Sequence, residues 1–228
     1  MTKIVIGPDD WHEVYKELEG EILKPSVYDD FIIGQMGDVN NMRILDYGCG
    51  PGIIGDVLEN YNADVDIYDI NKKILEIARK RIPNENIIES TSKIKKETYD
   101  FVLCNLVLCI VDDNQVYEIL HDLYYALKNK GIAIIGFCNP KIFNIRETNL
   151  DLRNFTGDKY KDNHLYIKQK KEGGYYISEM HRPIEWYEAS FIKAGFQLKK
   201  KLFTTPYTFK GRRRRISDFV VFKLIKVK

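Results

Sequence analysis

The sequence predicts an α/β protein whose parallel sheet is covered by helices on both faces. Three observations support this fold class. Short apolar runs alternate with amphipathic helical patterns between residues 40 and 138. The run 99–108 is apolar on both faces, which is typical of a central parallel strand. A glycine-rich turn at residues 48–52 joins the first strand of this series to a helix. Such alternation favours a parallel sheet with helices on both sides.

The composition restricts the classes of protein to consider. The chain has 228 residues, 44% of them hydrophobic, so it can bury the core of a single domain. Lysine and arginine number 35 against 33 acids, a balance that requires neither a nucleic acid nor a membrane as partner. No run of 18 apolar residues occurs, and the N-terminal apolar run is too short for a signal peptide. The 4 cysteines form no C-x-x-C pair, which favours reduced, half-buried thiols in a cytoplasmic protein without zinc.

The glycine turn carries the strongest functional signal. From Ile44 to Gly55 the chain reads I-L-D-Y-G-C-G-P-G-I-I-G. Glycines at alternate positions remove every Cβ from one side of the turn, so that a ligand can lie against the backbone. The turn also presents the backbone N–H groups of a helix N-terminus to that ligand.

Two ligand classes use this geometry. Residues 50–55 fit the G-x-G-x-x-G pattern of dinucleotide-binding turns. The overlapping pattern Asp46-x-Gly-x-Gly-x-Gly resembles the first motif of the class I S-adenosylmethionine-dependent methyltransferases. A carboxylate at Asp46 would repel a pyrophosphate, whereas it tolerates a ligand with an ammonium and a sulfonium. We therefore favour the methyl donor over a dinucleotide, and a purely structural turn is the least favoured of the three.

The resemblance covers residues 40–138 well and residues 181–228 moderately. It implies a Rossmann-like sheet of seven strands, mostly parallel with an antiparallel last strand. It also implies in-line methyl transfer from S-adenosylmethionine, with S-adenosylhomocysteine as product and no metal. We expect a single domain that spans residues 1–228. It begins with an N-terminal helical cap at 1–38, followed by a cofactor-binding core at 40–138. A β-hairpin flap inserted after strand five covers 139–182, and residues 183–228 form the C-terminal part of the sheet.

The resemblance assigns expected cofactor contacts. Asp69 ends the second predicted strand, which suits a bidentate contact with both ribose hydroxyls. Asp46 would orient the methionine moiety, directly or through water. The family usually has an acid near Ser90 that binds the adenine amino group; here Ser90 or Thr91 would replace it, and an ordinary polar turn is the alternative. The full set is Asp46, Gly48, Cys49, Gly50, Gly52, Asp69, Ile70, Ser90, Thr91, Asn105 and Leu106.

The remaining core elements follow from periodicity and capping signals. Asn71 and the pair Asp112–Asp113 are suited to cap helices. Asn105 ends the apolar fourth strand, where it would face the cofactor or the transferred methyl group. The elements predicted after the glycine turn are a helix at 53–61, a strand at 63–70, a helix at 72–81, a strand at 86–89, a helix that ends at Lys130–Gly131 and a fifth strand at 131–138.

Two helices are expected before the sheet begins. They cover residues 9–23 and 27–36, where apolar side chains recur at helical spacing. By resemblance they cover the cofactor and part of the substrate pocket. Tyr15 and Tyr28 are candidate substrate contacts, and packing against the sheet is the alternative for both.

Residues 139–182 break the alternation of strands and helices. Two strand-like runs at 164–168 and 175–180 flank a Lys-Glu-Gly-Gly turn, so an antiparallel hairpin is expected. The hairpin leaves the carboxyl edge of the sheet, where ligands bind in open α/β folds. We interpret it as a substrate-covering flap with Tyr166 and Tyr176 as candidate contacts; an edge for homodimerisation is the alternative.

The C-terminal part is expected to complete the sheet. A helix follows Pro183, and strands are predicted at 197–203 and 218–226. The run from His181-Arg182-Pro183 to Ala194-Gly195-Phe196 resembles the segment before strand six in small-molecule and quinone-type methyltransferases. The run Arg212–Arg215 is interpreted as a solvated loop, and contact with phosphate or RNA is the sharper alternative.

The favoured function is O- or N-methylation of a small-molecule acceptor. Positioning alone can lower the barrier by about 7–11 kcal/mol, so a catalytic base is not obligatory. If the acceptor is a hydroxyl, His181 is the first candidate base and His164 the second. The alternatives are a methyltransferase acting on RNA or protein, a non-catalytic S-adenosylmethionine-binding protein and, more distantly, a nicotinamide oxidoreductase. A monomer and a homodimer both stay open.

Overall fold

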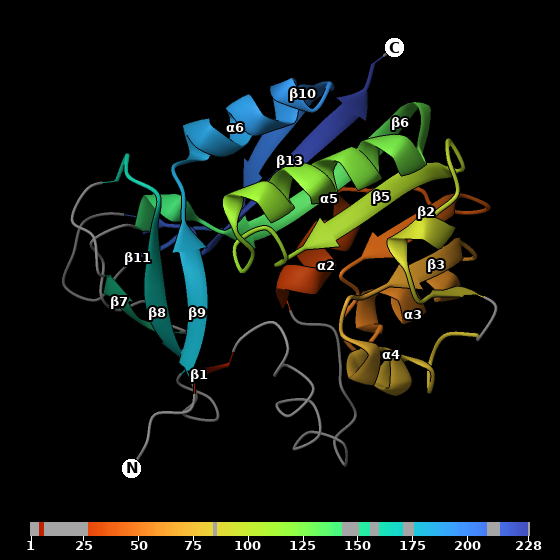
Figure 1. The fold of residues 1–228 in the computed structure, drawn as a ribbon, viewed down its shortest axis with the longest axis horizontal. Coiled ribbons are helices and arrows are strands. Elements are labelled where there is room, and N and C mark those ends of the chain that lie inside the picture. Colours follow the sequence, from red (N-terminus) through yellow and green to blue (C-terminus); the bar gives the residue numbers. More distant parts are fainter. Residues whose placement is uncertain are drawn as a thin grey trace.

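The centre of the protein is a sheet of seven strands (Figure 1). The computed structural model describes residues 5–6, 27–83, 86–142, 151–155, 160–170, 176–208 and 215–227. In spatial order the strands are β10 (Phe196–Phe203), β13 (Phe219–Lys226), β6 (Leu127–Cys138), β5 (Tyr99–Asn105), β2 (Arg43–Tyr47), β3 (Asp64–Tyr68) and β4 (Ile87–Ile88). Only β13 runs antiparallel to its neighbours. The predicted Rossmann-like sheet with an antiparallel last strand is confirmed.

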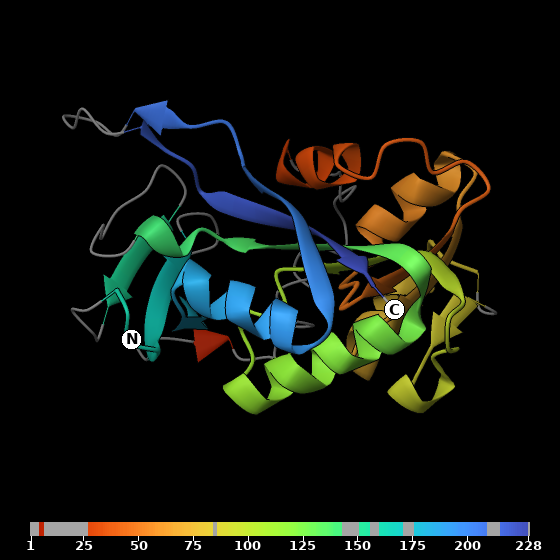
Figure 2. The same cartoon turned by 90° about the horizontal axis from the view of Figure 1, so that it is seen from above.

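Helices cover both faces of this sheet, as Figure 2 shows from above. On one face lie α2 (Val27–Gly34), α3 (Ile53–Asn60) and α4 (Lys72–Ala78). The other face carries α5 (Asp113–Ala126) and α6 (Ile184–Lys193). Each set of helices buries its apolar side chains in a separate hydrophobic cluster against the sheet. Two apolar layers explain why the central strand β5 is hydrophobic on both faces.

The residues predicted to cap helices α4 and α5 do so in the structure. The Asn71 side chain accepts hydrogen bonds from the backbone N–H groups of Lys73 (3.1 Å) and Ile74 (3.3 Å) at the start of α4. Asp112 and Gln115 form a reciprocal capping box at the start of α5. These caps fix where each helix begins, and therefore where the loops before them meet the cavity described below.

The predicted end of the helix that follows the fourth predicted strand was wrong. Helix α5 ends at Ala126 rather than at Lys130–Gly131, because Leu127 already pairs with Tyr99 in the parallel sheet. The register then shifts, and Lys130 adopts a positive φ of 64° within the irregular stretch. Sheet pairing thus overrides the helical pattern. The helix predicted at 72–81 is also shorter and stops at Ala78.

A second sheet of four strands adjoins the main one. Its order is β1 (Val5–Ile6), β9 (Tyr176–His181), β8 (His164–Lys170) and β7 (Asp151–Phe155). Antiparallel β8 and β9 confirm the predicted hairpin, although its turn lies outside the described residues. The outer strands β7 and β1 were not predicted, because neither has a clear alternating pattern. Two-residue strands β11 (Tyr207–Thr208) and β12 (Arg215–Ile216) pair separately.

Arg182 ties the second sheet to the main one. Its side chain is fully buried and bonds the Asp113 carboxylate (2.6 Å) and the carbonyls of Leu108 (2.9 Å) and Val111 (2.7 Å). The guanidinium also lies 4.9 Å from the ring centre of Trp186. Arg182 therefore holds the loop that follows β5, which forms part of the cavity wall.

Some predictions fall outside the described residues. They are the helix at 9–23 with Tyr15 and most of the arginine run, Arg212 to Arg214. The 4 cysteines are all buried rather than half-buried, and none is in a disulfide. Among the described helices, none combines the length and apolar character needed to cross a bilayer.

Candidate functional site

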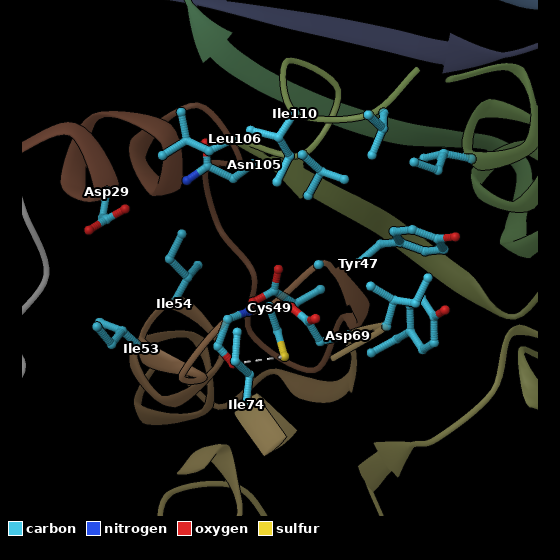
Figure 3. A pocket seen from close by; sticks show the side chains of 18 of the residues that line it. Asp29, Tyr47, Cys49, Ile53, Ile54, Asp69, Ile74, Asn105, Leu106 and Ile110 are labelled. Atoms are coloured by element: carbon cyan, nitrogen blue, oxygen red, sulfur yellow. Dashed lines mark hydrogen bonds between the residues drawn. The ribbon is translucent and has the colours of Figure 1, made fainter. Parts of the chain in front are cut away.

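A cavity of about 940 Å³ opens at the carboxyl ends of β2, β3 and β5. Its walls come from the glycine turn, the ends of these strands, α2, α5 and the start of β13. Figure 3 shows Asn105, Leu106 and Ile110 on one side and Cys49, Ile54 and Ile74 on the other. The volume lies at the upper end of the range for small-molecule sites, about 300–1,000 Å³.

The glycine turn needs its glycines for conformation and for space. Gly48, Gly50 and Gly52 have positive φ angles of 79°, 54° and 77°. A Cβ on Gly48 would lie 2.2 Å from Cγ2 of Val107, so any side chain here would force Val107 to move. The backbone N–H groups of Gly48 and Cys49 both donate to the Tyr68 carbonyl, at 2.7 and 3.0 Å. The turn is therefore closed against the neighbouring strand β3.

Asp69 links the turn to the end of β3. One carboxylate oxygen accepts the backbone N–H of Gly50 at 3.0 Å, and the other accepts that of Asn71 at 2.8 Å. Burial raises the pKa of Asp69, and these two hydrogen bonds oppose that shift. The carboxylate is thus held in one orientation at the cavity wall.

Asp46 is a buried carboxyl group without a full set of partners. It is 2% exposed, and its Oδ2 atom has no hydrogen-bond partner. Burial raises the pKa of Asp46 to about 7, and the nearby charges of Asp69 and Asp29 add to the shift. A cationic group in the cavity would supply the missing partner and favour the ionised form.

Two apolar side chains project where water can reach them. Ile70 is 71% exposed and Leu106 is 37% exposed, and both line the cavity. Leu106 has a positive φ of 59°, a strained conformation for a non-glycine residue. Ile70 and Leu106 therefore give this part of the cavity an apolar surface.

The α2 side of the cavity has a different character. The rings of Tyr28 and Phe219 stack with centroids 3.9 Å apart. The Tyr28 hydroxyl and the Asn105 Oδ1 atom are both buried and have no hydrogen-bond partner. Burial raises the pKa of Tyr28, so its hydroxyl stays protonated and can donate a hydrogen bond.

The cavity brings together most of the predicted cofactor contacts. Those on its wall are Asp46, Gly48, Cys49, Gly50, Asp69, Ile70, Thr91, Asn105 and Leu106. Gly52 and Ser90 do not line it. Gly52 precedes α3 as its N-cap residue, and Ser90 caps the short helix Thr91–Lys93 by accepting from the Ser92 backbone N–H.

The cavity wall does not include the predicted bases or the flap tyrosines. His181 is buried, and its Nε2 atom lies 2.8 Å from the Tyr160 carbonyl. Burial lowers its pKa. The His164 ring lies 4.8 Å from that of His181, and Tyr166 bonds the Glu179 carboxylate. Of the substrate candidates, Tyr28 lines the cavity, whereas Tyr166 and Tyr176 do not. Roles for these off-wall residues stay untested predictions.

Sequence reasoning missed two parts of the wall. On α5, Gln115, Glu118 and Asp122 face the cavity, and the Tyr47 hydroxyl donates to Asp122 at 3.1 Å. Their helical spacing opposite the buried stripe was a usable signal. At the other end lie Thr204, Thr205, Asp218 and Phe219, which only strand pairing brings there. Among the described residues, no cluster of three or more His, Cys, Asp or Glu side chains could hold a metal ion.

Comparisons with known proteins agree with this geometry. Residues 45–135 match a family model described as "Methyltransferase domain". The ubiquinone biosynthesis O-methyltransferase of Photorhabdus laumondii is 29% identical over 118 residues, 48% of each chain. That of Rickettsia bellii is 32% identical over 110 residues, 45% of this chain and 44% of the relative. The chain thus aligns with about half the length of these curated relatives.

Solved structures share the fold over most of the chain. A putative S-adenosylmethionine-dependent methyltransferase from Listeria monocytogenes matches with a TM-score of 0.66 and 20% identity, over 87% of this chain and 97% of that one. The glycopeptide N-methyltransferase MtfA, complexed with S-adenosylmethionine, matches with a TM-score of 0.63 and 11% identity, over 90% and 96%. Residues 45–135 therefore match a methyltransferase domain, and the chain shares the fold of these solved methyltransferase structures.

Proposed function

We propose that the protein binds S-adenosylmethionine in this cavity and transfers its methyl group to oxygen or nitrogen of a small-molecule acceptor. The proposal rests above all on a glycine-rich turn at positive φ that is flanked by the buried carboxyl group of Asp46 and the partly buried carboxylate of Asp69. The bound cofactor would supply an electrophilic methyl group, so the task of the chain is to hold and orient its ligands. We define the cofactor half of the cavity by Asp46, the turn residues 48–51, Asp69, Ile70 and Leu106.

Asp69 is suited to hold the ribose. A carboxylate offers about four lone-pair sites, and the N–H groups of Gly50 and Asn71 use only two of them. The remaining sites could accept both ribose hydroxyls. Asp46 is suited to the ammonium of the methionine moiety, because a cation would offset the burial of its carboxylate.

Ile70 and Leu106 are suited to the adenine ring. Both are apolar and exposed at the cavity, so contact with a flat base would remove their surface from water. A dinucleotide is a poorer candidate, because its phosphates would meet two carboxylates. The names of the relatives, which include O- and N-methyltransferases, support both acceptor heteroatoms.

Calorimetry with S-adenosylhomocysteine tests the cofactor assignment. We expect a micromolar Kd, weakened at least about tenfold in Asp69→Asn, because one ribose contact is lost. Asp64→Asn is the matched control, since Asp64 lies at the exposed start of the same strand and should leave the Kd unchanged. Absence of binding to the wild-type protein would refute the proposal. Binding without methyl transfer to any acceptor would instead support the non-catalytic alternative.

A further inference from the structure

The strand order leaves half of the cavity to the acceptor. The cofactor half lies at the ends of β2 and β3, and the sheet continues through β5 and β6 to β13. The wall over these later strands comes from the end of β5, the start of β13, the residues after β10, and α2. We define this acceptor half by Tyr28, Asp29, Asn105, Thr204, Asp218 and Phe219.

The cavity is strongly acidic. No lysine, arginine or histidine occurs among the described residues that line it. Two carboxylates, Asp46 and Asp69, belong to the cofactor half, and two others lie on α5. Asp29 and Asp218 remain in the acceptor half. The acidic side chains of the whole wall are Asp29, Asp46, Asp69, Glu118, Asp122 and Asp218.

Unpartnered polar atoms in the acceptor half point independently to a ligand. The Tyr28 side chain is 8% exposed, yet its hydroxyl has no hydrogen-bond partner, and neither has Asn105 Oδ1. Both oxygens surround Gly136: a Cβ there would lie 2.3 Å from the hydroxyl and 3.1 Å from Oδ1. The glycine thus makes room for a donor and an acceptor that do not bond each other. Leaving both unpaired is costly unless a ligand satisfies them.

We infer that the acceptor is a small amine on a flat apolar body, and that the protein methylates its nitrogen. This inference rests on the proposed function. The acidic wall would attract the ammonium form, and the stacked rings of Tyr28 and Phe219 favour both an apolar body and a nearby cation. Asn105 Oδ1 would accept an N–H of the amine. A carboxylate or phosphate acceptor would be repelled by the acids of this wall.

The chemical step balances without a further reactant. The ammonium first gives one proton to a carboxylate of the acceptor half, Asp29 or Asp218, and through it to solvent. The freed lone pair forms the N–C bond while the C–S bond breaks and its electron pair stays on sulfur. The products are an N-methylammonium and S-adenosylhomocysteine.

Matched pairs of probes test the inference by binding as well as by activity. The pairs are 2-phenylethylamine with 3-phenylpropionate, benzylamine with benzoate, and tryptamine with indole-3-propionate. Calorimetry would measure each probe on protein saturated with S-adenosylhomocysteine. We expect the amine of a pair to bind at least about tenfold more tightly, and amines alone to accept a methyl group. Carboxylates that bind as well as their amines, or no binding by any amine, would overturn it.

Variants that replace a carboxylate by a neutral amide test which residues cause the preference for amines over carboxylates. Asp29→Asn and Asp218→Asn should each reduce the amine preference by about tenfold, whereas Asp38→Asn should not, because Asp38 is exposed in the turn after α2. An unchanged preference in both variants would contradict the inference. The affinity for S-adenosylhomocysteine reports whether each variant is folded. If wild-type protein fails to bind it, the proposed function fails; if only the amine preference is absent, the inference alone fails.

Discussion

The two halves of the cavity are built from different parts of the polypeptide. The cofactor half consists mainly of backbone: glycines at positive φ, and N–H groups fixed by Asp69 and the Tyr68 carbonyl. The acceptor half consists of side chains from α2, β5 and β13, and two of its buried oxygens have no partner. The N–H groups of the glycine turn have partners before any ligand arrives, whereas Asp46 Oδ2 and the two oxygens of the acceptor half do not. The turn is therefore preorganised, and the unpartnered oxygens carry an energetic cost that a ligand can remove.

Arg182→Met should reduce the free energy of unfolding more than any other variant, because Arg182 holds the loop after β5 that forms part of the cavity wall. The substitution removes the guanidinium hydrogen bonds to the carbonyls of Leu108 and Val111 and the ion pair with Asp113. We expect a loss of roughly 3–5 kcal/mol in the free energy of unfolding, measured by urea denaturation. Arg79→Met is the control: its pairs with Glu76 and Glu89 lie at the surface, so a loss under about 1 kcal/mol is expected. Equal losses would show that Arg182 is not the link.

Asp46→Asn should stabilise the empty protein at high pH. The pKa of Asp46 is about 7 in the folded state and ordinary in the unfolded chain. Between these values the native state binds more protons, so wild-type stability falls as pH rises from about 4 to 7 and stays low above. The variant lacks this loss and should be more stable by roughly 2–4 kcal/mol at pH 8, with no difference near pH 4.

The same carboxyl group should couple cofactor binding to proton release. An ammonium beside Asp46 favours its ionised form, so wild-type protein near pH 7 should release up to about half a proton when it binds S-adenosylhomocysteine. Calorimetry in buffers of different ionisation enthalpy measures that release. Asp46→Asn should bind more weakly and release none; the same release by the variant would exclude Asp46 as the source.

Gly48→Ala tests the backbone cradle. The new Cβ would lie 2.2 Å from Val107 and would sit on a residue at φ 79°. We expect the affinity for S-adenosylhomocysteine to fall about 100-fold, or roughly 2–3 kcal/mol. Gly37→Ala separates the two causes, because Gly37 has φ 80° with no atom near its Cβ position. An unchanged Kd in Gly48→Ala would mean that the turn is not the cofactor bed.

Tyr28→Phe should change the free energy of unfolding least of these variants, and it should stabilise the protein rather than destabilise it. Removing a buried hydroxyl without a partner should raise the free energy of unfolding by about 1 kcal/mol, seen as a small increase in Tm. The Kd for S-adenosylhomocysteine should stay unchanged, while methyl transfer to the acceptor weakens. A destabilised variant would show that the hydroxyl has a partner in solution.

The sequence by itself determined the cofactor half. Glycines at alternate positions, an acid before them and Asp69 at the end of the next strand are local signals, because backbone geometry and parallel strand ends follow from nearby residues. The alternation of elements indicated a parallel sheet with helices on both faces, and the family resemblance implied its seven strands.

Only the tertiary structure decided the acceptor half and the limits of the elements. Pairing of β6 with β13 brings Phe219 beside Tyr28, although the two are far apart in the chain, and no local pattern signals that contact. Pairing of Leu127 with Tyr99 ends α5 before its apparent stop signal. The absence of His181 and His164 from the cavity wall also depends on how the second sheet packs. The local sequence does not distinguish the side chains that line the cavity from those that do not. Contacts between residues far apart in the chain decide which of them reach the ligand.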